Sequence, residues 1–232
     1  MSVSELEVKH AASAVGNARD LSLDAASDGK LTPTEAWSRR VRRVGGLIQV
    51  AFAALWLVRG SLVIGGVVSG VLIVASGVAV IGVLSYGIKV TAGTAPRPRT
   101  REGKRIERDI TVATVIELAA AFALPVLVTA AGHSDWVLPS IAITIGPLLL
   151  YLDHLVHIPR YRPVGWLLTI GPLILVATMS GTPLVATTGI TAGVVLLGTA
   201  LAGFRDLAGL RSRAAQAESG KIGFSAITGA RP

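Results

Sequence analysis

Cysteine is absent from this chain of 232 residues, so the sequence excludes disulfide bonds and thiolate metal sites. Charge is also scarce: 16% of the residues are charged, against about a quarter in a soluble domain. Residues 1–36 contain no apolar run of signal-peptide length, and we expect no cleavable signal there. What the chain has instead is apolar. Hydrophobic residues make up 51% of it and its mean hydropathy is +0.63, which is typical of a membrane protein.

The longest apolar stretch runs from Val44 to Val90, and the only charge well inside it is Arg59. A single helix of that length would measure about 70 Å, whereas the hydrocarbon core of a bilayer is about 30 Å thick. The stretch must therefore fold back on itself, and the sequence predicts the turn at Arg59-Gly60-Ser61.

The rest of the chain repeats this plan of apolar runs joined by polar connections. We predict an all-α polytopic membrane protein with six transmembrane helices arranged in three hairpins. A polar cytoplasmic tail (1–36) precedes the transmembrane domain (37–204), and a second cytoplasmic tail (205–232) follows it, with a short surface helix at its start. The predicted spans cover about residues 44–58, 61–84, 110–131, 136–152, 164–179 and 184–204.

Lysine and arginine decide the predicted orientation. With both termini in the cytoplasm, all of the 22 basic residues except Arg59 lie on the cytoplasmic side. This arrangement accounts for the net charge of +8 without a nucleic-acid partner. It also predicts contact with the anionic inner leaflet of the cell membrane.

Residues 24–35 support two interpretations. Asp24, Asp28 and Glu35 occupy ligand positions of a segment that resembles an EF-hand calcium loop, but Ala26 at the third position of the loop supplies no ligand oxygen. The alternative is a helix start, in which Thr32 is the N-cap and Glu35 closes a capping box. We favour the helix start.

A stripe of glycines lies on the second predicted span. Gly66, Gly70 and Gly77 fall within about 40° of one another around a helix, and the first two have the spacing of a helix-packing motif. Small residues let two helix backbones approach closely. We therefore predict a packing face, against the first span or, alternatively, against a second copy of the chain.

Glu117 is the only carboxylate inside a predicted span. Because a charge is costly in lipid, this residue is a candidate proton or cation site. The alternatives are a hydrogen bond in helix packing or a contact with a nearby arginine such as Arg108. Three prolines interrupt the later spans, where freed backbone carbonyls can line a substrate or ion pathway: Pro125, Pro147 and Pro172.

Asp153, His154 and His157 form a second candidate site, because histidines three residues apart share a helix face and could hold a metal. We favour the alternative, a polar cluster at the membrane interface. The sequence contains no phosphate-binding glycine loop with a lysine, no Ser/His/Asp pattern and no HExxH pattern. We therefore predict no cofactor and favour a non-enzymatic protein over an enzyme.

An internal similarity connects the later spans. Residues 125–150 align without a gap on residues 172–197 and match at seven positions. This alignment favours a duplicated helical hairpin, and the alternative is chance similarity within a small apolar alphabet.

Two functions of different class follow from these features. The glycine stripe, the basic cytoplasmic surface and the scarcity of charge within the spans favour a membrane scaffold or accessory subunit, with a homo-oligomer or another membrane protein as partner. The prolines, the internal similarity and Glu117 favour a small-solute transporter or channel.

Overall fold

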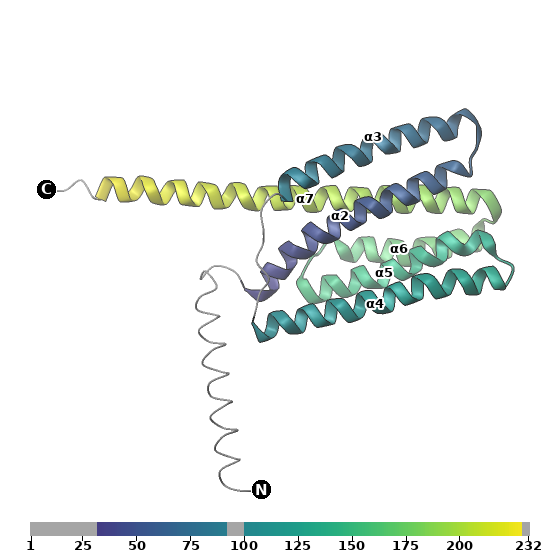
Figure 1. Cartoon of the computed structure of the whole chain (residues 1–232), viewed down its shortest axis with the longest axis horizontal. Coiled ribbons are helices and arrows are strands. Elements are labelled where there is room, and N and C mark those ends of the chain that lie inside the picture. The colour runs from purple at the N-terminus through teal and green to yellow at the C-terminus, as the bar shows by residue number, and fades with distance from the viewer. Residues whose placement is uncertain (1–31, 92–99, 229–232) are drawn as a thin grey trace, which may run out of the picture.

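The structure, a computed structural model, describes residues 32–91 and 100–228, and beyond Leu210 it describes the backbone and the side chain of Ser212. Six of its helices are long and apolar enough to cross a bilayer, which confirms the predicted all-α membrane class. A short 3-10 helix, η1, accompanies them (Figure 1). The elements are α2 (Pro33–Leu62), α3 (Gly66–Thr91), α4 (Arg101–Ala130), η1 (Ser134–Trp136), α5 (Val137–Val156), α6 (Tyr161–Thr178) and α7 (Gly181–Thr228).

Helix α2 begins with the predicted capping box. The backbone N–H of Glu35 donates to the Thr32 hydroxyl at 3.2 Å, and the N–H of Thr32 donates to the Glu35 carboxylate at 2.9 Å. Pro33 takes the first helical position, where a missing N–H costs nothing. Glu35 therefore serves the helix start, while Asp24 and Asp28 of the calcium-loop alternative lie outside the described residues.

The predicted turn at Arg59-Gly60-Ser61 is wrong, because α2 continues to Leu62. The chain reverses over the next three residues, and Gly65 has a φ of 74°, which glycine adopts at little cost. Gly60 and Ser61 are both buried, and Gly60 lies against α7. Packing thus holds the Gly60-Ser61 pair in the helix, although the sequence there would suit a turn.

The most extensive helix contact in the described part of the chain is between α2 and α7. A Cβ atom placed on Gly189 would lie 2.7 Å from the Cα of Gly60, and one placed on Gly60 would lie 2.8 Å from the backbone nitrogen of Ile190. Gly193 meets the side chain of Leu57 in the same way. The two backbones therefore touch, and nothing larger than glycine fits where they cross.

Helices α5 and α6 form a second close pair through Gly146 and Gly165. A Cβ on Gly146 would lie 2.7 Å from the carbonyl oxygen of Gly165, and one on Gly165 would lie 2.8 Å from that of Gly146. Both close pairs, α5 with α6 and α2 with α7, join helices that were predicted to belong to different hairpins. Helix α4 packs along α5, whereas α6 and α7 contact each other little, so the two halves of the internal similarity are packed differently.

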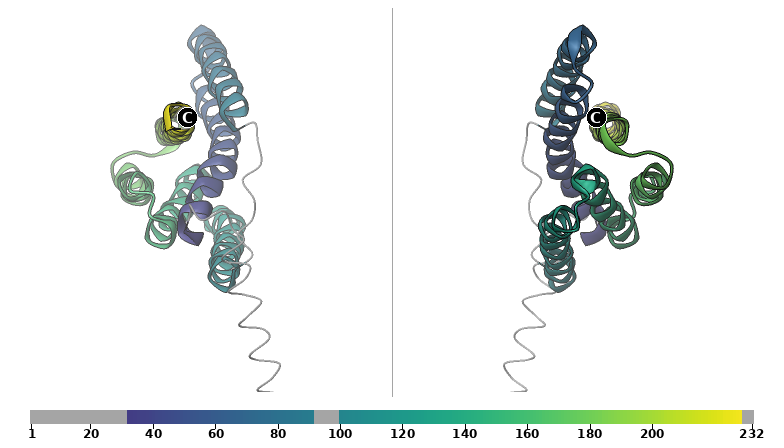
Figure 2. Two further views of the ribbon diagram at one scale, coloured as in Figure 1. Left: turned by 90° about the vertical axis from the view of Figure 1, so that its left-hand side faces the viewer. Right: turned by 90° about the vertical axis from the view of Figure 1, so that its right-hand side faces the viewer.

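Helices α3 and α4 lie at the margins of the bundle (Figure 2). Only 6% of the most apolar part of α3 is buried, and 0% of that of α4, against 44% in α7. The described part of α3 is held mainly near its C-terminal end, where the fully buried ring of Phe204 lies against Gly46 of α2 and Gly87 of α3. Val50, Val83 and Ala200 complete the buried part of this small apolar cluster.

Helix α7 continues past the bundle as a single element to Thr228 (Figure 1). With 48 residues it is about 70 Å long, roughly twice the thickness of a bilayer core. The prediction of a separate short surface helix after residue 205 is therefore wrong, since no break occurs between the apolar part and the polar part.

Candidate functional sites

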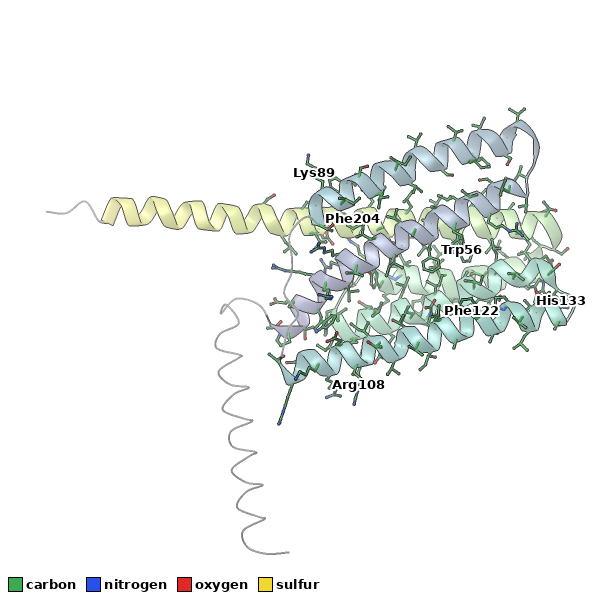
Figure 3. All side chains as sticks on the ribbon, in the orientation of Figure 1. Trp56, Lys89, Arg108, Phe122, His133 and Phe204 are labelled. Carbon is green, nitrogen blue, oxygen red and sulfur yellow. The ribbon has the colours of Figure 1, made fainter. Side chains whose placement is uncertain are left out.

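A groove of about 710 Å³ runs between α4 and α5, and Glu117 lies in its wall. Most of the lining is aliphatic, and the polar side chains in it are few. Arg108 and Asp109 stand at the basic end of the groove, which is the end of the bundle that also carries Arg42 and Arg160. In Figure 3, Arg108 marks that end of α4 and His133 marks the opposite end of the bundle. The polar lining residues are Arg108, Asp109, Glu117, Thr144 and Tyr151.

The Glu117 carboxylate forms no ion pair or hydrogen bond with another side chain in the described part of the chain. The nearby basic residues are engaged elsewhere: Arg108 pairs with Asp109 at 3.5 Å, and Arg105 pairs with the same carboxylate at 3.9 Å. Glu117 is partly buried and faces the groove. The structure therefore does not contain the alternative in which Glu117 contacts Arg105 or Arg108.

The prolines predicted for the pathway do not come together. Pro147 lines the groove with Glu117, whereas Pro125 is not part of the groove lining and Pro172 is buried in α6. Since Pro147 has no N–H, the carbonyl of Ile143, which also lines the groove, lacks the donor that a helix normally gives it. The groove thus combines the unpaired carboxylate of Glu117 with a helix segment that lacks one backbone hydrogen bond.

The predicted metal residues serve other purposes. Asp153 is buried and accepts a hydrogen bond at 3.1 Å from Nε of Arg162. His154 is exposed, and His157 ends α5 with a left-handed φ of 52°. No group of three or more potential metal ligands occurs in the part of the chain that the structure describes. Asp153 therefore joins α5 to the start of α6.

The glycine stripe has no partner within the described residues. No described atom outside the adjoining residues and backbone of α3 itself lies within 4 Å of a Cβ placed on Gly66, Gly70 or Gly77. The stripe therefore does not pack on α2, which was the first of its two predicted partners. A second copy of the chain remains a prediction.

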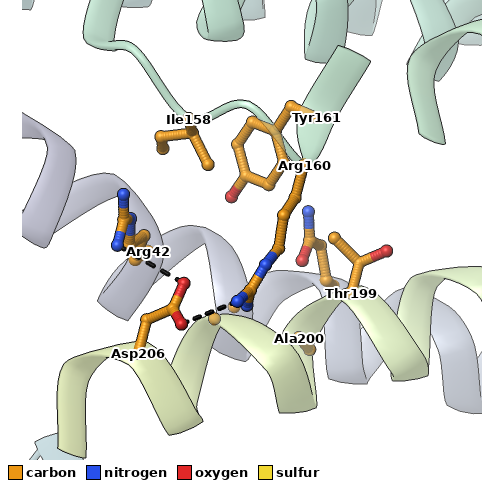
Figure 4. Close-up of a pocket in the computed structure, with 10 residues that line it drawn as sticks. Arg42, Ile158, Arg160, Tyr161, Thr199, Ala200 and Asp206 are labelled. Carbon is orange, nitrogen blue, oxygen red and sulfur yellow. Dashed lines mark hydrogen bonds and ion pairs between the residues drawn. The ribbon is translucent and has the colours of Figure 1, made fainter. Parts of the chain in front are cut away.

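A polar cluster at the basic end of the bundle was missed by the sequence analysis. The Asp206 carboxylate of α7 pairs with Arg160 at 2.7 Å and with Arg42 of α2 at 3.5 Å (Figure 4). Tyr161 and Gln49, both buried, line a cavity of about 10 Å³ beside them. Asp206 thus joins α7 to α2 and to Arg160, which directly precedes α6. The sequence feature that could have indicated this role is one acidic residue, two positions after a predicted span, among basic neighbours.

A second polar contact at the same end joins α2 to α4. The indole N–H of Trp37 donates to the carbonyl of Gly103 at 3.0 Å, and Trp37 is buried. The guanidinium of Arg40 lies 5.6 Å from the centre of the same ring, within cation–π range. The N-terminal turns of α2 and α4 are therefore fixed relative to each other.

These helices and contacts define the class: the chain is a multi-pass membrane protein. No family model, characterised protein or solved structure matches it.

Proposed function

We propose that this protein is a non-enzymatic scaffold or accessory subunit of the cell membrane that associates with a second copy of itself through α3. The observation that carries the proposal is the contrast between two sets of glycines. Gly60, Gly189, Gly146 and Gly165 mark the points where helices of this chain touch. Gly66 and Gly70 on α3 have the same four-residue spacing as Gly189 and Gly193 on α7, but the α3 stripe lies against nothing in the described chain.

The exposure of α3 supports a partner for this face. In a bilayer there is no hydrophobic drive for one apolar helix to join another, so association depends on close backbone packing. Gly70 and Gly77 leave a smooth face along α3, with Val74 exposed at 67% and Val78 at 69% beside them. A helix that packs on this face of α3 would gain contacts that lipid chains form less well.

The basic end of the bundle supports the orientation and the surroundings that the proposal needs. Arg39, Arg40, Arg42 and Arg43 precede the apolar part of α2, and the positive-inside rule assigns such residues to the cytoplasm. At that surface they would face the anionic leaflet of the cell membrane. The proposal involves no nucleic acid.

The test is self-association in liposomes, measured by energy transfer between two labelled populations of the protein at increasing lipid dilution. Gly70→Leu combined with Gly77→Leu should lower the transfer to the level of random mixing, because the two leucine side chains prevent close packing on the glycine face of α3. Gly82→Leu is the matched control, since Gly82 is also uncontacted but lies about 120° or more away around the helix. Transfer at the random level for the unaltered protein would contradict the proposal.

A second candidate function is small-solute transport, and the groove that contains Glu117 favours it. A carboxylate without a partner inside a span is typical of proton and ion pathways. If the chain transports a cation or a proton-coupled solute, Glu117→Gln should abolish pH-dependent flux into liposomes. Equal flux through both proteins would remove this candidate.

A further inference from the structure

We propose that the groove between α4 and α5 binds an organic cation with an apolar body, and that the charge of this ligand pairs with Glu117. The inference deepens the second candidate function by naming its ligand class, and it does not depend on the self-association of α3. The groove is large enough for a small molecule: its volume of about 710 Å³ falls within the usual range of ligand sites, roughly 300–1,000 Å³.

Charge complementarity selects a cation. Glu117 has no partner among the described residues, while the other carboxylate of the groove, Asp109, is already paired with two arginines. An ionised carboxylate in lipid surroundings needs a counter-charge to offset the loss of water. The groove therefore contains one carboxyl group without a partner, and its one basic side chain, Arg108, is already paired.

The remaining polar groups also accept hydrogen bonds. The Ile143 carbonyl has lost its helical donor at Pro147, and the Tyr151 hydroxyl can accept as well as donate. Thr144 is engaged, since its hydroxyl donates to the carbonyl of Ile141 at 2.8 Å. A ligand with N–H or other polarised donors around its charge suits such a lining better than an anion does.

The position of the groove favours entry from the bilayer. The groove lies between two helices at the margin of the bundle, and its walls are small or aliphatic at Ala113, Ala120 and Leu148. Glu117 is eight residues beyond Asp109, which places it about 12 Å deeper along α4. A cation with an apolar body can dissolve in the membrane and reach that depth, whereas a strongly hydrated ion cannot do so without a water-filled path.

Tetraphenylphosphonium and tetraphenylborate are suitable probes, because they have nearly the same shape and opposite charge. Binding is measured at equilibrium by calorimetry with the full chain in lipid nanodiscs, and no transport is needed. Tetraphenylphosphonium should bind the unaltered protein, and Glu117→Gln should weaken this binding by about tenfold or more, as expected when one member of a buried charge pair is removed. Glu117→Asp should retain most of the affinity.

Two further variants test whether the probe binds in the groove and whether its binding depends on Glu117 in particular. Glu102→Gln removes an exposed carboxylate from the first turn of the same helix and should leave binding unchanged. Ala120→Phe keeps the charge but fills the groove, and it should weaken binding as Glu117→Gln does. Thermal unfolding verifies that each variant is folded.

Binding to empty nanodiscs is subtracted for both probes. The proposal is overturned if tetraphenylphosphonium then shows no binding, if tetraphenylborate binds equally well, or if Glu117→Gln leaves the affinity unchanged. Binding that requires Glu117 without any flux in liposomes would support the site and remove the transport function.

Discussion

The α2–α7 interface and helix α3 use glycine in opposite ways. At the interface, Gly60 and Gly189 lie so close that neither could carry a side chain without displacing the other helix. On α3, Gly70 and Gly77 have open space where a side chain would be. The residue type is the same in both places, so what distinguishes an internal packing site from an available surface is the tertiary neighbour and not the glycine motif.

The largest effect should come from the residue that connects the two regions. Phe204→Ala removes a fully buried ring between α2, α3 and α7 and should lower the free energy of unfolding by about 3–5 kcal/mol. Phe122→Ala is the matched control, because Phe122 is 70% exposed on α4 and its loss leaves no internal cavity. Chemical unfolding in detergent measures both. Equal losses at the two positions would show that Phe204 does not anchor α3.

Substitution by alanine should change the free energy of unfolding in opposite directions at a glycine in a helix contact and at an exposed glycine of α3. Gly189→Ala forces the α2 and α7 backbones apart and should destabilise the fold by about 1–3 kcal/mol. Gly70→Ala meets no neighbour and favours the helix, so it should stabilise α3 by up to about 1 kcal/mol. Thermal unfolding of the two variants, at protein concentrations low enough to keep the chain monomeric, gives the comparison. Destabilisation by both substitutions would mean that α3 has an internal partner.

An effect of similar size should come from the polar cluster at the basic end. Asp206→Asn removes the charge that joins Arg42 and Arg160, and should cost about 1–3 kcal/mol, since it leaves the partly buried Arg42 without its carboxylate. Asp109→Asn, whose two arginines are exposed, should cost less than about 1 kcal/mol. Unfolding at low and high salt distinguishes the two variants, because screening should reduce the loss of stability in Asp109→Asn more than that in Asp206→Asn.

The sequence was sufficient for features that depend on local pattern. The apolar runs predicted six membrane helices, and the spacing of Thr32 and Glu35 predicted the capping box. The turn was misplaced because Gly60-Ser61 and Gly65-Gly66 both look like turn sequences. Only the burial of Gly60 against α7 shows which pair reverses the chain.

Features that depend on distant residues could not be predicted. Arg42, Arg160 and Asp206 come from separate parts of the chain, and no spacing rule relates them. Glu117 was identified because a carboxylate within a span is costly. The groove around it exists because of the way α4 packs on α5, which no pattern along one helix specifies.

The most direct test of the proposed α3 contact uses the absence of cysteine, because any introduced thiol is then the only one in the chain. Gly70→Cys, Gly77→Cys and Gly82→Cys are each oxidised in native membranes, and the fraction of disulfide-linked dimer is measured on non-reducing gels. We expect efficient dimer formation from position 70 or 77 and little from position 82. Equal crosslinking at all three positions, or none at 70 and 77, would contradict it.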